Sequence, residues 1–98
     1  MKMLIIVGRD SILSELEALL RENGISAYSI ISNVVGKGLT GSVYGTFLHP
    51  DINSIICLVL PSDQADRAVS ALQTLLTTRN LGQPAPPKVV TLPCEEHI

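Results

Sequence analysis

A glycine-rich stretch at residues 33–45 contains the first residues whose types and spacing could do chemistry. Its segment 36–41 reads Gly-Lys-Gly-Leu-Thr-Gly and matches the G-x-G-x-x-G pattern with which dinucleotide-binding folds hold a pyrophosphate. In that pattern the third glycine opens a helix, whereas here the strand-like run SVYGTFL follows at residues 42–48. No G-K-[S/T] triplet opens a helix either. The context therefore excludes a Rossmann turn and a Walker A loop.

Two interpretations of this stretch stay open. It can be a long hairpin connection whose glycines supply the positive φ angles that tight turns need. Alternatively, the backbone amides of Gly36, Lys37 and Gly38, together with the Lys37 ammonium and the Thr40 hydroxyl, can form an anion-binding nest.

The C-terminal tail, residues 94–98, carries the second set of reactive groups. Cys94, Glu95, Glu96 and His97 bring a thiol, two carboxylates and an imidazole into four residues, a donor set that suits Zn²⁺ or Cu²⁺. Only Cys94 and His97 are soft or borderline donors. The alternative to a metal site is therefore a frayed tail that binds no metal. No nucleophile–base–acid set is evident, so we do not expect an enzyme.

Composition limits the class of protein. The 98 residues suffice for one domain, 1–98. The chain is 46% hydrophobic and 3% aromatic, which predicts an aliphatic core. A net charge of −2 argues against nucleic-acid binding. The apolar run 3–7 is too short for a signal-peptide core or a membrane span, and the two cysteines form no disulfide framework. We therefore expect a cytoplasmic protein.

The elements that must position these residues follow from periodicity. An apolar strand is predicted at 3–7, then a helix that Asp10 caps and that Asn23-Gly24 ends. Residues 25–35 predict a strand whose Ile30-Ile31 doublet indicates a bulge. Residues 54–60 predict a third strand in which Cys57 is a small core residue.

The remaining chain predicts one more helix and one more strand. Apolar residues recur at three- and four-residue steps from Ala65 to Leu76 and predict a helix that ends near residue 80. The proline-rich segment 83–87 predicts a loop because proline supplies no ladder amide, and 88–92 predicts the last strand. Arg9 and Arg79 could each add positive charge to a cleft.

This order predicts a ferredoxin-like α+β sandwich of βαββαβ topology, with two helices on one face of a four-stranded antiparallel sheet. A strand with one solvent-exposed face should alternate apolar and polar residues, yet 3–7 is apolar throughout and 54–60 is apolar after Ser54. Burial of a second apolar face is worth on the order of 10 kcal/mol. We therefore predict an obligate homo-oligomer.

Short motifs along nearly the whole chain resemble the PII-like signalling proteins. They are the opening strand and helix that end in Gly24-Ile25, Val34-Val35-Gly36-Lys37-Gly38 before a long loop, the strand that ends in Pro61-Ser62-Asp63, and the segment 82–88. The resemblance implies a ferredoxin-like homotrimer that binds adenine nucleotides in clefts between subunits.

The resemblance also assigns segments and residues. It implies that 36–53 is the T-loop and 80–87 the B-loop, and that both line the cleft. The effector contacts that it implies are Ser32, Gly36, Lys37, Gly38, Gly82 and Lys88.

Three departures from the family pattern are visible. Prolines replace glycines in the B-loop region, no basic pair follows Lys88, and the glutamine expected after Gly38 is absent. The last departure disfavours metal-assisted 2-oxoglutarate binding. Tyr44 lies near the position where some members carry a modified tyrosine.

The sequence therefore predicts a cytoplasmic PII-like regulatory protein. It would bind a small anionic effector, ATP, ADP or AMP, with no required cofactor, and signal through the 36–53 loop to a target protein such as a membrane transporter or an enzyme. Two alternatives stay open. One is a CutA-like trimer that binds metal through Cys94 and His97, and the other is an ACT-type amino-acid-binding regulatory dimer.

Overall fold

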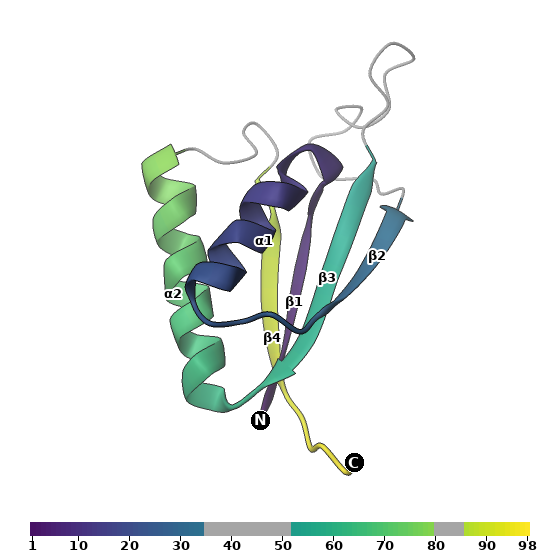
Figure 1. Cartoon of the computed structure of the whole chain (residues 1–98), viewed down its shortest axis with the longest axis vertical. Coiled ribbons are helices and arrows are strands. Elements are labelled where there is room, and N and C mark those ends of the chain that lie inside the picture. Colours follow the sequence, from purple (N-terminus) through teal and green to yellow (C-terminus); the bar gives the residue numbers. More distant parts are fainter. Residues whose placement is uncertain (35–51, 80–85) are drawn as a thin grey trace.

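The computed structural model describes residues 1–34, 52–79 and 86–98. The order of the elements is β1 (Lys2–Arg9), a 3-10 turn η1 (Asp10–Ile12), α1 (Leu13–Glu22), β2 (Ser29–Val34), β3 (Asn53–Leu60), α2 (Ser62–Arg79) and β4 (Lys88–Pro93). Four antiparallel strands form one sheet in the order β2-β3-β1-β4, and both helices cover the same face (Figure 1). The predicted ferredoxin-like sandwich is confirmed.

The core lies between the helices and one face of the sheet. Leu4 and Ile6 of β1 are fully buried, and Ile56 of β3 is 1% exposed. Leu16 and Leu20 of α1 pack onto them, with Ala65, Ala68 and Leu72 from α2. The side chains of this core are aliphatic, as the composition predicts.

The first helix begins differently from the prediction that the Asp10 side chain caps it. No side-chain hydrogen bond caps the N-terminus of η1 or of α1. Instead, Asp10 Oδ1 accepts a hydrogen bond of 2.9 Å from the Ser54 hydroxyl, and the Asp10 amide donates to the Ile52 carbonyl at 2.7 Å. A partner from β3, distant in sequence, thus replaces the local cap.

The end of α1 follows the prediction. Gly24 has φ of 76°, a left-handed conformation that glycine adopts at little cost. This turn lets the Ile25 amide donate to the Leu20 carbonyl at 2.9 Å and returns the chain to the core, where Ile25 is 3% exposed.

The second strand is shorter than predicted but bulged as predicted. It starts at Ser29, because residues 25–28 do not pair in the sheet. Its register with β3 shifts between Ile31 and Val34, where Asn33 has φ of 61°. Asparagine tolerates this conformation better than most residues, so the irregularity falls at Asn33.

Candidate functional site

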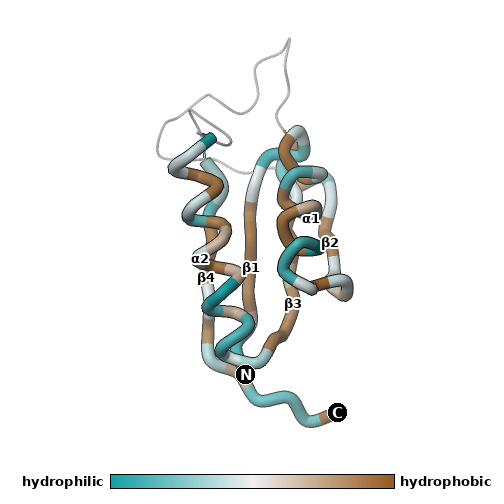
Figure 2. The backbone as a smooth tube through the Cα atoms, turned by 60° about the vertical axis from the view of Figure 1, so that its left-hand side comes forward, coloured by the Kyte–Doolittle hydropathy of each residue, from teal (hydrophilic) through white to brown (hydrophobic). Residues whose placement is uncertain are grey.

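The face of the sheet away from the helices is apolar. Met3, Ile5 and Val7 alternate with the buried residues of β1. Their direct neighbours on β3 are Val59, Cys57 and Ile55. Figure 2 shows both strands coloured hydrophobic along most of their length. The prediction that these strands are apolar on both sides is confirmed.

Strand pairing arranges this open face in rows, because directly opposite residues of antiparallel strands point to the same side. One row is Val90, Ile5, Cys57 and Ser29, from β4 through β1 and β3 to β2. A second row is Lys88, Val7, Ile55 and Ile31.

A groove of about 510 Å³ lies at the β2 side of this face, near the chain termini. It is lined by Met3, Ala27, Tyr28, Ser29, Cys57, Leu58, Val59 and Glu96. Thus β1, β2, β3, the segment before β2 and the tail all contribute. Cys57 is half-buried on the open face, so the prediction that it is a small core residue is wrong.

The chemistry of the groove suits a flat apolar ring with a polar edge. Met3 and Val59 offer apolar walls. The cross-strand pair Ser29 and Cys57 adds a hydroxyl and a thiol, and Glu96 adds a carboxylate that can accept from an amino group. The described lining holds no lysine or arginine, so a phosphate on the ligand would need its cation from outside the groove.

The structure places two of the predicted effector residues, Ser32 and Lys88, on opposite edges of the sheet. Ser32 follows Ile31 on β2, and Lys88 begins β4. Lys88 and Ile31 belong to one row, but three strand spacings separate them. At about 4.8 Å per spacing this is about 14 Å. One chain therefore does not bring them to a common ligand.

The other predicted effector residues, Gly36, Lys37, Gly38 and Gly82, lie outside the described residues, as does Tyr44. Arg9 ends β1 opposite Asn53, and its Nε and Nη2 atoms are buried. Arg79 lies at the end of α2, on the helix side of the sheet, and so adds no charge to the open face.

The predicted metal ligands Cys94 and His97 lie in the tail. Cys94 is half-buried, and its amide donates to the Met1 carbonyl at 3.3 Å. His97 is largely exposed, with Nε2 at 3.7 Å from Glu95 Oε2. Within residues 1–34, 52–79 and 86–98, no three His, Cys, Asp or Glu side chains are grouped to hold a metal. Metal binding by Cys94 and His97 stays a prediction.

Sequence reasoning did not predict that Ser29, Cys57 and Glu96 share a groove. A polar residue at 29 beside the apolar doublet Ile30-Ile31 is only a weak indication of a binding groove. A glutamate in the tail gives no indication of one. Their proximity depends on the pairing of β2 with β3 and on the path of the tail, which no local pattern encodes.

The βαββαβ order, the split sheet and its groove define a ferredoxin-like α+β protein. More specifically, the chain belongs to the nitrogen regulatory protein P-II family, whose model matches residues 1–96. The family's members are regulatory proteins. No curated protein matches the chain.

Solved structures of CPII, a nitrogen regulatory PII-like protein from Thiomonas intermedia K12, are similar to this chain. The form bound to ADP, AMP and bicarbonate has a TM-score of 0.71 at 22% identity, over 93% of this chain and 82% of that one. The form bound to ADP, AMP and acetate has a TM-score of 0.67 at 20% identity, over 92% and 81%. At these identities the likeness establishes the fold.

The described part of the chain has no helix with the length and apolar character needed to cross a membrane.

Proposed function

We propose that the chain is a PII-type sensor that binds an adenine nucleotide between the edges of neighbouring copies in a homotrimer. The nucleotide state would be passed to a target protein through the connection 36–53. The protein acts by binding, not by catalysis, and needs no further cofactor. The family match favours this function over the CutA-like and ACT-type alternatives.

The observation that carries the proposal is the separation between Lys88 and the groove that suits a flat apolar ring. The groove lies on the β2 side of the open face and its described lining has no positive charge. Lys88 lies exposed on the β4 edge. An extended adenine nucleotide separates its base from its phosphates in the same way. If the β4 edge of one copy lies against the β2 edge of the next, the partner subunit's Lys88 supplies the missing charge.

The apolar open face supports the assembly. Ile31, Val90 and Leu92 are 52%, 47% and 40% exposed, and they continue the half-buried surface of β1 and β3. Contiguous apolar surface of this kind marks an interface. Contact between copies would cover it and bring their edges together.

The groove would give the base of the nucleotide both apolar and polar partners. The base would lie against Met3 and Val59, with its amino group toward Glu96 and its ring edge toward Ser29. The similar CPII structures contain ADP, AMP and small anions, which favours adenine nucleotides among the possible effectors.

Calorimetry on the purified chain with ADP, AMP, adenosine and GDP tests the proposal. Lys88→Gln should weaken ADP about 10-fold, since a charge-assisted hydrogen bond contributes about 1.5–3 kcal/mol, and leave adenosine unchanged. Ser29→Trp should weaken ADP and adenosine alike by filling the groove. The matched controls are Lys2→Gln, on the helix side, and Ser26→Trp, an exposed position outside the groove lining.

Two results would contradict the proposal. One is the absence of any stabilisation by adenine nucleotides at millimolar concentration, because saturation at 100 times Kd adds about 2.7 kcal/mol. The other is equal loss of ADP and adenosine binding in Lys88→Gln.

A further inference from the structure

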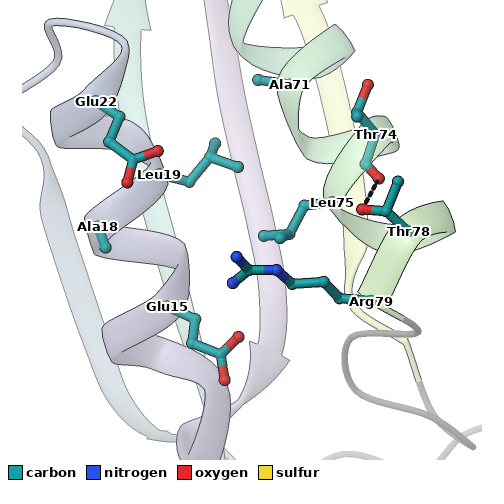
Figure 3. A pocket seen from close by; sticks show the side chains of 9 residues that line it. All are labelled: Glu15, Ala18, Leu19, Glu22, Ala71, Thr74, Leu75, Thr78 and Arg79. Atoms are coloured by element: carbon teal, nitrogen blue, oxygen red, sulfur yellow. Dashed lines mark hydrogen bonds between the residues drawn. The ribbon is translucent and has the colours of Figure 1, made fainter.

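The helical face of the molecule carries a second groove, on the opposite side of the sheet from the proposed nucleotide site. It runs between α1 and α2, with a volume of about 310 Å³ (Figure 3). Its lining residues are Glu15, Ala18, Leu19, Glu22, Ala71, Thr74, Leu75, Thr78 and Arg79.

The floor of this groove is apolar. Leu19 and Leu75 point between the two helices (Figure 3), and the small residues Ala18 and Ala71 also line the groove. Small side chains at such positions let the backbone of a third helix approach closely. The floor therefore offers apolar contact from two leucines and two alanines, with the Arg79 side chain extending between the helices beside Leu75 (Figure 3).

The α2 wall is uncharged and presents methyl groups. Residues 69–78 include no charged residue. The hydroxyls of Thr74 and Thr78 donate to the carbonyls of Ser70 and Thr74, at 3.0 and 2.8 Å. Because these hydroxyls bond within the helix, the threonines offer mainly their γ-methyl groups outward. Depletion of charge is characteristic of the centre of an interface.

The α1 wall is acidic. Glu15 and Glu22 direct their carboxylates toward the groove (Figure 3). They are seven residues apart, which is about 10.5 Å along the helix. Arg79, from the end of α2, is the single cation among the lining residues, so the groove has a net charge of −1.

We infer that this groove docks a basic amphipathic helix of a partner protein. The helix would place small apolar residues on the floor and two lysines or arginines, seven residues apart, against Glu15 and Glu22. This is the helix-in-groove mode of recognition. Because the basic residues of the partner helix have the same seven-residue spacing as Glu15 and Glu22 on α1, each cation can lie beside one carboxylate. A second copy of this chain fits less well, since it would bring two acidic walls together. The inference does not depend on the nucleotide site.

The test uses an alanine-rich helical probe of about 15 residues with two lysines seven positions apart and leucine between them. A matched probe has glutamine at both lysine positions. Binding to the full chain is measured by fluorescence anisotropy, and the contact surface by amide chemical shifts. We expect the lysine probe to bind about 10-fold more tightly and to shift amides of α1 and α2.

Variants of the chain locate the interaction. Glu15→Lys and Glu22→Lys should each weaken the lysine probe by about 3- to 10-fold, as expected for reversal of a partly exposed charge. Arg79→Gln should tighten it. Glu17→Lys is the control, because it makes the same charge change on the same helix but does not line the groove. Circular dichroism confirms that each variant is folded.

Four results would overturn the inference. They are equal binding of the two probes, no saturation with either, equal weakening by Glu17→Lys, and self-association of the chain that Glu22→Lys abolishes.

Discussion

Ser54 donates a hydrogen bond of 2.9 Å to the Asp10 carboxylate, and this contact joins the start of β3 to the turn after β1. Ser54 is 3% exposed and is the only polar residue that is buried as a whole in the described parts of the chain. The two residues are 44 positions apart in sequence. The bond fixes the end of the sheet from which α1 departs.

Replacement of Ser54 by alanine tests this contact. We expect Ser54→Ala to lower the free energy of unfolding by about 1–2 kcal/mol, since it removes a hydrogen bond to a charged acceptor. Urea denaturation followed by circular dichroism measures the change. Ser70→Ala is the control, because Ser70 is exposed on α2 and its loss should change stability by less than about 0.5 kcal/mol. Equal effects of the two substitutions would contradict the assignment.

Gly8 is predicted to be intolerant of a larger side chain. A Cβ atom at this position would lie 3.2 Å from Pro87 Cβ and 3.4 Å from Ile12 Cδ1. Gly8→Val should therefore destabilise the chain by about 2–3 kcal/mol, the usual cost of overpacking. Chemical denaturation measures it.

The companion variant Gly8→Val/Pro87→Gly shows whether Pro87 is the obstacle. Because it removes the Pro87 Cβ atom that the new side chain would meet, it should recover part of the lost stability relative to Pro87→Gly alone. Additive effects of the two changes would show that Pro87 does not limit this position.

Charge on the open face should dissociate the proposed oligomer. Val90 and Thr91 are both exposed neighbours on β4, but Val90 lies opposite Ile5 on the open face and Thr91 opposite Leu4 on the helix side. We expect Val90→Glu to convert the trimer to monomers in sedimentation velocity, since burial of an unpaired charge is costly. Thr91→Glu makes the same charge change and should leave the trimer intact. A wild-type chain that sediments as a monomer would remove the basis of the proposed intersubunit site.

The sequence by itself predicted the local elements of this protein. Helical spacing from Leu13 to Leu20 and from Ala65 to Leu76 and the apolar runs at 3–7 and 54–60 each depend on neighbours in the chain. These signals also predicted the order of the elements, a bulge in the strand that contains Ile30-Ile31, and the apolar second face of the sheet. Such features are predictable because periodicity and turn chemistry act over a few residues.

The tertiary structure decided where those elements bring their side chains. The Asp10 cap was wrongly predicted because Ser54, distant in sequence, competes for the same carboxylate. Ser29, Cys57 and Glu96 share a groove only because β2 pairs with β3 and the tail passes beneath them. Lys88 and Ser32 lie on opposite edges because β1 and β3 occupy the centre of the sheet. Contacts of this kind depend on long-range strand order, which no single segment of the sequence specifies.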